Sequence, residues 1–161
     1  MNVFDFAMKM ELDGKAYYQE FARNTNIIGL KAIFTMLAAD EQKHYDVVSA
    51  MKQGAGGKMA DSTVLEDARN VFQDLMADKT LAAGLSKSLD GYRHAMKVEA
   101  DSVKLYEDMA HKENDEETAR LLLKIAEEEK KHYSIMENLY DYTLAPQNYL
   151  AWGEFSNLKE F

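Results

Sequence analysis

Residues 41–45 read EQKHY and residues 129–133 read EKKHY, so the chain carries one Glu-x-x-His pattern twice, 88 residues apart. The same offset aligns residues 7–22 with residues 95–110, where seven of 16 positions are identical. Composition alone would give roughly one identity in such a comparison. In each half a further glutamate precedes the pattern by 30 residues: Glu11 precedes Glu41, and Glu99 precedes Glu129. The sequence therefore contains an internal duplication that includes potential metal ligands.

Apolar residues recur at steps of three and four along four segments, at about 3–23, 30–51, 89–111 and 117–142. This spacing places them on one face of an α-helix. One proline and eight glycines among 161 residues are also typical of a helical protein. At about 1.5 Å per residue, each segment is about 30 Å long, which suits a four-helix bundle. The sequence predicts an all-α fold in one domain, 1–161, with a four-helix bundle made of two duplicated helical hairpins.

The connections between these segments differ in length. Short polar breaks at 24–28 and 112–116 predict that the two helices of each hairpin are antiparallel neighbours. A long crossover, 52–88, joins the hairpins, and residues 64–76 within it have the pattern of a shorter amphipathic helix. The sequence leaves open whether this helix packs on its own bundle or on a second chain. It also leaves open whether the aromatic C-terminal tail, 143–161, closes the bundle or docks on a partner subunit.

Charge and composition argue against several functions. Nineteen Lys and Arg against 28 Asp and Glu give a net charge of -9, which opposes binding to nucleic acid or to anionic membranes. No segment approaches the run of about 18 apolar residues that a membrane span needs, and the N-terminus has no signal-peptide pattern. We therefore expect a cytoplasmic protein. The absence of cysteine excludes disulfides, thiol nucleophiles and thiolate metal centres, so oxygen and nitrogen atoms must hold any metal.

Six residues of the duplicated pattern fall where the apolar stripe predicts core positions. Four carboxylates at the centre of a small bundle would be costly to desolvate and would repel one another. Two divalent cations would neutralise them, and two neutral imidazoles would complete the ligand set. Carboxylate with imidazole favours iron or manganese, and zinc is a chemical alternative. We predict a metal site formed by Glu11, Glu41, His44, Glu99, Glu129 and His132.

Other polar residues near these six are predicted to have different roles. Tyr18 and Tyr106 share the stripe two turns from the glutamates, so they are candidates to contact metal ligands, with core packing an equally good explanation. His94 and His111 fall off the stripe or near a helix end and are predicted to be surface residues. Glu128 projects about 100° away from its neighbour on the helix, which predicts a solvated side chain. Replacing Glu128 with alanine is accordingly expected to be mild.

One Glu from each of two helices, with Glu-x-x-His from each of the other two, is the ligand pattern of ferritin-like di-iron bundles. Over roughly residues 3–142 the chain resembles that superfamily and, within it, the rubrerythrin-like proteins. The resemblance implies a ferritin-like bundle with two iron ions, bridged by Glu41 and Glu129. The terminal ligands that it implies are Glu11 with His44 for one ion and Glu99 with His132 for the other.

Two features of the chain depart from the rubrerythrin pattern. Rubrerythrins carry an additional glutamate ligand one turn from the matched one on the third helix, where this chain has Met96 and Ser102. They also commonly carry a rubredoxin domain with four cysteines, and this sequence has none. Both differences lie outside the six predicted ligands.

The resemblance implies an enzyme, a di-iron peroxidase or oxidase that reduces hydrogen peroxide or dioxygen and protects against oxidative stress. Because the chain has no cysteine and no Gly-rich dinucleotide-binding turn, we expect a separate electron-donor protein. The alternatives are a ferroxidase or other iron-handling protein, and a structural metal-binding protein that interacts with a partner. We also expect a homodimer or a higher homo-oligomer. The sequence does not identify the physiological oxidant, the electron donor or the native metal.

Overall fold

The computed structural model describes residues 2–55, 58–77 and 88–144. These residues form the helices α1 (Val3–Asn24), α2 (Ile28–Lys52), α3 (Val64–Ala77), α5 (Leu89–Lys112) and α6 (Glu116–Leu144). The described part of the chain contains no strand. The four long helices begin and end within two residues of the segments predicted from apolar periodicity. The predicted all-α fold is confirmed.

Local side-chain chemistry explains where several helices begin and end. Asn2 Oδ1 accepts the Asp5 amide at the start of α1 (2.9 Å), and Asp115 Oδ2 accepts the Thr118 amide in the first turn of α6 (3.0 Å). Such caps satisfy amides that have no partner inside the helix. After α2, Gly54 has a φ of 77°, a left-handed conformation that favours glycine at a helix end. The chain leaves α2 there and enters the crossover.

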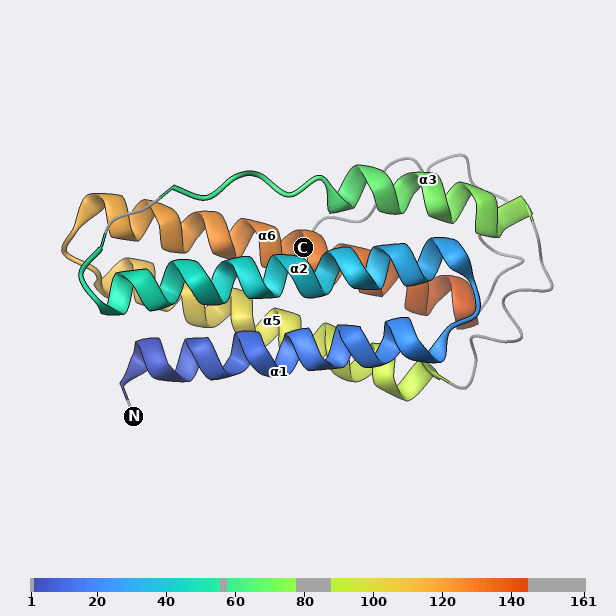
Figure 1. The fold of residues 1–161 in the computed structure, drawn as a ribbon, viewed down its shortest axis with the longest axis horizontal. Helices are drawn as coiled ribbons and strands as arrows, with labels where there is room; N and C mark the ends of the chain where they lie inside the picture. Colours follow the sequence, from blue (N-terminus) through green and yellow to red (C-terminus); the bar gives the residue numbers. More distant parts are fainter. Residues whose placement is uncertain (1, 56–57, 78–87, 145–161) are drawn as a thin grey trace.

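The two hairpins and the crossover are visible in Figure 1. Helices α1 and α2 pack as one antiparallel hairpin, and α5 and α6 pack as the second. The crossover runs back along the bundle, and α3 within it packs on α2 and α6. Val64, Ala68, Phe72 and Leu75 of α3 are buried in a core cluster shared with those helices. The crossover helix therefore packs on its own bundle, which the sequence had left open.

Two apolar core clusters leave a polar layer between them. The cluster at the α3 end includes Tyr18, Leu37 and Ile135, and the other includes Ala7 and Val48. On each of the four long helices, the predicted ligand positions fall between a residue of one cluster and a residue of the other. The fold therefore places these polar residues at mid-bundle, with apolar packing on both sides.

Helix α6 has 29 residues and ends at Leu144. Its last turns are tied to the crossover because the Tyr142 hydroxyl donates to the Leu75 carbonyl (2.7 Å). The predicted aromatic tail beyond Leu144 lies outside the described residues. None of the helices described here is both long and apolar enough to cross a membrane.

Candidate metal centre

All six predicted ligand residues converge at mid-bundle, and none is more than 2% exposed. Their ligand atoms form two groups in which all atoms lie within 4.8 Å of one another. The first group is Glu11, Glu41, His44 and Glu129, and the second is Glu41, Glu99, Glu129 and His132. Glu41 and Glu129 belong to both groups, so the two groups adjoin and share two carboxylates.

Tyrosines from one hairpin face glutamates of the other. The Tyr18 hydroxyl donates to Glu99 Oε1 (2.7 Å), and burial followed by the charge of Glu99 raises the pKa of Tyr18 well above its ordinary value. Burial followed by the charge of Glu11 does the same to the pKa of Tyr106. Both side chains therefore stay protonated, and Tyr18 contacts a predicted ligand, one of the two roles expected for it.

An outer carboxylate holds each histidine on the side away from the centre. His44 Nε2 lies 2.8 Å from Glu128 Oε1, and His132 Nε2 lies 2.9 Å from Asp40 Oδ2. Because a carboxylate only accepts hydrogen bonds, each Nε2 must carry a proton. Each contact joins the two hairpins, since Asp40 and His44 belong to α2 whereas Glu128 and His132 belong to α6. Asp40 was not among the residues predicted from the sequence for this site.

With Nε2 committed to these outer carboxylates, Nδ1 is the ring nitrogen that faces the centre. His44 Nδ1 lies 2.7 Å from Glu129 Oε1, and His132 Nδ1 lies 2.8 Å from Glu41 Oε1. The two imidazole rings are stacked, with centroids 5.9 Å apart. Each histidine therefore points Nδ1 at a carboxylate that belongs to both ligand groups. The contact of Nε2 with the outer carboxylate, on the opposite edge of the ring, fixes this orientation.

Several buried ligand atoms make no hydrogen bond of good geometry among the described residues, although two of them, His44 Nδ1 and Glu129 Oε1, lie 2.7 Å apart. These ligand atoms are Glu11 Oε2, His44 Nδ1, Glu99 Oε2 and both carboxylate oxygens of Glu129. Leaving such a group unsatisfied costs about 1–3 kcal/mol, and more when the group is charged. Divalent cations would satisfy these lone pairs and neutralise the clustered carboxylates. The residues present therefore fit a pair of bound metal ions.

The rubrerythrin family model matches residues 2–140, which includes every predicted ligand. The chain belongs to the rubrerythrin family. The family is a branch of the ferritin-like di-iron superfamily and implies metal binding, which agrees with the two buried Glu and His groups. Comparisons with curated proteins and with solved structures gave no match. The resemblance identified from the six residues is confirmed at the level of family and fold.

Glu128 in this rubrerythrin-family protein is buried, so the prediction of a solvated side chain is wrong. Its side chain is 3% exposed and also accepts from the Ser62 amide (3.1 Å) and pairs with Lys43 (3.2 Å). The prediction assumed solvent beyond the four long helices, whereas the crossover covers this side of α6. The duplication contained a signal for this position. The 88-residue offset pairs Glu128 with Asp40, so an acidic residue directly precedes each predicted bridging glutamate.

Replacing Glu128 with alanine should therefore weaken metal binding about 10- to 100-fold, the usual effect of losing a group that orients a ligand. The expected cause is loss of the carboxylate that holds His44. Anaerobic calorimetric titration of the metal-free protein with ferrous iron would measure the affinity. The neighbouring Glu127 is exposed, and Glu127→Ala is the matched control. Equal affinities for the two variants would contradict this role for Glu128.

In the absence of metal, the surroundings of this cluster in the rubrerythrin-family protein favour the protonated forms of its central side chains. Burial, and then the charge of Glu11, raise the pKa of Glu41 and of Glu129 well above the ordinary value. Burial alone would lower the pKa of His44 and His132, but the surrounding carboxylates outweigh it and raise both pKa values. Metal binding must displace these protons, so the affinity for metal should fall on acidification.

Gly14 lets α1 approach one of the shared carboxylates. A Cβ added at Gly14 would lie 2.9 Å from Glu41 Oε2, closer than side-chain carbons normally pack. A larger residue at this position would displace the Glu41 carboxylate or the helix. The position equivalent to Gly14 in the second half of the chain is Ser102, which is also buried.

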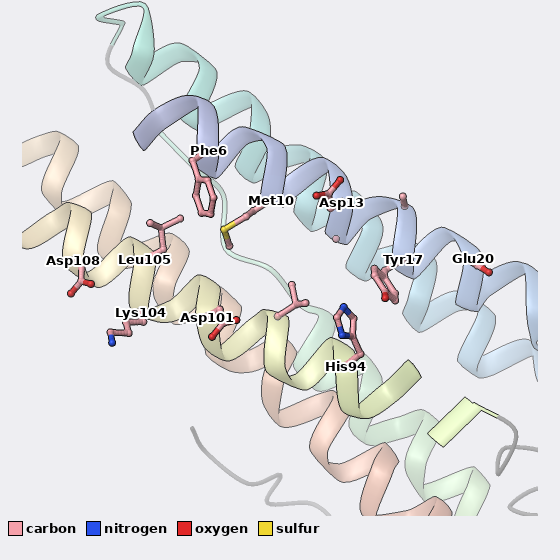
Figure 2. Close-up of a pocket in the computed structure, with 13 residues that line it drawn as sticks. Phe6, Met10, Asp13, Tyr17, Glu20, His94, Asp101, Lys104, Leu105 and Asp108 are labelled. Carbon is pink, nitrogen blue, oxygen red and sulfur yellow. The ribbon is translucent and has the colours of Figure 1, made fainter. Parts of the chain in front are cut away.

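A groove with a volume of about 890 Å³ lies between α1 and α5 (Figure 2). Its apolar lining includes Phe6, Met10, Val98 and Leu105, and Gly14 belongs to it as well. The groove therefore reaches the thin layer that separates solvent from Glu41. Its acidic lining consists of Asp13, Glu20, Asp101 and Asp108, with Lys104 as the basic member.

The other two histidines of the chain lie away from the predicted ligands. His94 is exposed at the groove, where its ring lies 5.0 Å from that of Tyr17 (Figure 2). His111 is exposed near the end of α5. Both are surface residues, as predicted, and neither belongs to the groups that could hold a metal ion.

Proposed function

We propose that this protein is a non-haem di-iron oxidoreductase of rubrerythrin type, which reduces hydrogen peroxide or dioxygen with electrons from a separate donor protein. The observation that carries the proposal is the pair of buried carboxylate and imidazole groups that share Glu41 and Glu129. Shared ligands would hold two ions close enough to act on one small molecule. Two ferrous ions bound there would supply the two electrons that convert hydrogen peroxide and two protons into two waters.

Each of the six residues has a definite role in this proposal. Glu41 and Glu129 would contribute ligand atoms to both ions, because they are common to both groups. Glu11 with His44 would complete the ligand set of one ion, and Glu99 with His132 would complete that of the other.

The surrounding residues would orient these ligands and hold protons. Asp40 and Glu128 fix the imidazoles so that Nδ1 faces the ions. Tyr18 fixes Glu99 through its hydroxyl, and both Tyr18 and Tyr106 hold a proton beside a terminal glutamate. The groove between α1 and α5 offers a small oxidant a route toward Glu41.

The reduced protein should consume about one hydrogen peroxide per pair of iron ions and then stop, because two ferrous ions hold two electrons. The protein would be loaded with iron, reduced anaerobically and mixed with a stoichiometric series of peroxide. Residual peroxide and the absorption of the oxidised iron would be measured. Adding NADH alone should not restore turnover, since the chain has no cysteine relay.

Two outcomes would count against the proposed function. Continued loss of peroxide with NADH alone would contradict the need for a donor protein. Absence of any oxidation by peroxide or dioxygen would favour a structural metal site.

Because the chain has a net charge of -9, turnover with a basic donor protein should slow as salt is added.

The acidic lining of the groove supports a second candidate, a ferroxidase. Asp13, Glu20, Asp101 and Asp108 outnumber the basic Lys104, so the groove would attract cations such as ferrous iron. A ferroxidase would oxidise many ferrous ions per chain and release or retain the ferric product. Iron analysis after repeated additions of ferrous iron in air separates the two functions, because the proposed oxidoreductase should retain only the ions at its centre.

A further inference from the structure

We propose that Ser62, in the crossover, is a positioning residue that acts through its hydroxyl on one of the two metal positions and not on the other. The inference rests on the proposed metal centre and concerns how its histidines are held. Ser62 lies just before α3, outside both duplicated hairpins. No feature of the repeat would have singled it out.

Ser62 contacts both outer carboxylates, each through a different group. Its hydroxyl Oγ donates to Asp40 Oδ2 (2.5 Å), and that same oxygen accepts from His132 Nε2 (2.9 Å). Its backbone amide donates to Glu128 Oε2 (3.1 Å), while Glu128 Oε1 accepts from His44 Nε2 (2.8 Å). One residue therefore reaches both histidines, through the side chain toward His132 and through the main chain toward His44.

The segment that carries Ser62 is held firmly against α2 and α6. We call residues 58–63 the crossover strap. Lys43 of α2 donates to the Ala60 carbonyl (2.8 Å), and Lys124 of α6 donates to the Met59 carbonyl (2.5 Å). Met59 is 5% exposed and packs in a core cluster. These anchors on both helices keep the Ser62 amide in place when its side chain is changed.

The two histidines depend on different groups of Ser62: His132 on its hydroxyl, through Asp40, and His44 on its backbone amide, through Glu128. Ser62→Ala removes the hydroxyl donor to Asp40 but leaves the amide donor to Glu128. Without the hydroxyl, the described partners of Asp40 are His132 and Lys43, the latter at a distance of 3.9 Å. The Asp40 carboxylate would then orient His132 less firmly, and the ion held by His132 would bind more weakly.

Anaerobic calorimetric titration of metal-free protein with ferrous iron would test this inference, because it resolves the two binding events. Ser62→Ala should weaken one event about 10- to 100-fold and leave the other within about twofold. Asp40→Asn should weaken the same event. The double variant of Ser62→Ala with Asp40→Asn should lose little more than either single variant, because both act on His132. Ser62→Ala combined with Glu128→Gln should weaken both events.

Two matched variants separate positioning from general damage to the strap. Ser62→Thr keeps a hydroxyl and should retain most of the affinity that Ser62→Ala loses. Asp61→Ala removes an exposed partner of Lys124 in the same strap and should leave both binding events unchanged. Because the Val64 amide donates to Ser62 Oγ, Ser62→Ala could disturb α3, and Asp40→Asn gives the same test with that hydrogen bond intact.

The inference is overturned if Ser62→Ala leaves both affinities unchanged, or lowers both equally while Ser62→Thr restores neither. It is also overturned if Asp40→Asn weakens the two events to the same extent. Failure of the unmodified protein to bind two ferrous ions would instead overturn the proposed metal centre. Calorimetry of the unmodified protein therefore distinguishes failure of the inference from failure of the proposed function.

Discussion

Removing the metal at neutral pH is expected to lower the melting temperature of this protein by about 15 to 30 °C. An ion present at about 1,000 times its dissociation constant stabilises the folded state by about 4 kcal/mol, so two ions contribute about 8 kcal/mol. For a chain of this size, 1 kcal/mol corresponds to about 2–4 °C. Calorimetric melting before and after chelation would measure the shift. An unchanged melting temperature would mean that the six residues do not form one buried metal site.

The difference in melting temperature between the metal-bound and metal-free protein should depend on pH, because the metal-free cluster binds protons. The pKa values of Glu41, Glu129, His44 and His132 are raised on folding. Between the ordinary values, about 4.3 for Glu and 6.5 for His, and the raised ones, the folded metal-free protein binds more protons than the unfolded chain. Its stability therefore falls as pH rises through that window.

Three other carboxyl groups change the stability with pH in the opposite direction, because folding lowers their pKa values. Burial alone would raise the pKa of Asp40, Glu99 and Glu128, but their histidine partners outweigh burial and lower all three. Their contribution to stability is present above the ordinary carboxyl pKa, about 4, and is lost as pH falls through the lowered values. The metal-free protein should therefore become more stable as the pH falls from 8 toward about 4.5, where the lowered carboxyls still contribute fully. Because metal binding weakens in that range, the difference between the two melting temperatures should narrow on acidification from pH 8 to pH 5.

Replacing either shared glutamate should abolish binding of both metal ions. Glu41 and Glu129 contribute to both ligand groups, so Glu41→Ala or Glu129→Ala removes a ligand from each ion and a negative charge from the centre. Metal analysis of the purified variants should give less than one ion per chain. His94→Ala and His111→Ala change exposed histidines and should retain the normal metal content. Retention of one tightly held ion by Glu41→Ala would contradict the bridging role.

Periodicity and the internal repeat were sufficient to predict the bundle and the convergence of the six residues. Apolar steps of three and four fixed each helix and its buried face, and Glu11, Glu41, Glu99 and Glu129 fell on those faces. In a bundle of antiparallel hairpins, positions midway along the four helices meet at one level. The four carboxylates therefore had to meet, whatever the detailed packing.

The outer carboxylates and the strap depend on packing that helical periodicity does not encode. Glu128 is off the apolar stripe, and its burial requires the crossover to lie against α2 and α6. Residues 53–63 have no helical pattern, so nothing in the sequence aligned Ser62 with Asp40. The acid in front of each shared glutamate was visible in the repeat, but its contact with the histidine of the other hairpin was not.

The contacts between the hairpins come in reciprocal pairs. His44 reaches Glu128 and Glu129, and the equivalent His132 reaches Asp40 and Glu41. Reciprocal contacts of this kind characterise the isologous interface of a two-fold homodimer. The chain is thus organised as such a dimer fused by a linker. In a homodimer every substitution appears on both sides of the axis, whereas a fused chain can change one side alone.

Divergence between the fused halves is already present around the centre. In the 88-residue repeat, Asp40 is equivalent to Glu128, an acid of different length, and Gly14 is equivalent to Ser102. Gly14 lies against Glu41 and also lines the groove. A single mutation at Gly14 can therefore reshape the groove wall beside one carboxylate shared by the two ligand groups, while the serine at the equivalent position is unchanged. In a fused chain, the two sides of the centre can therefore differ in sequence independently of each other.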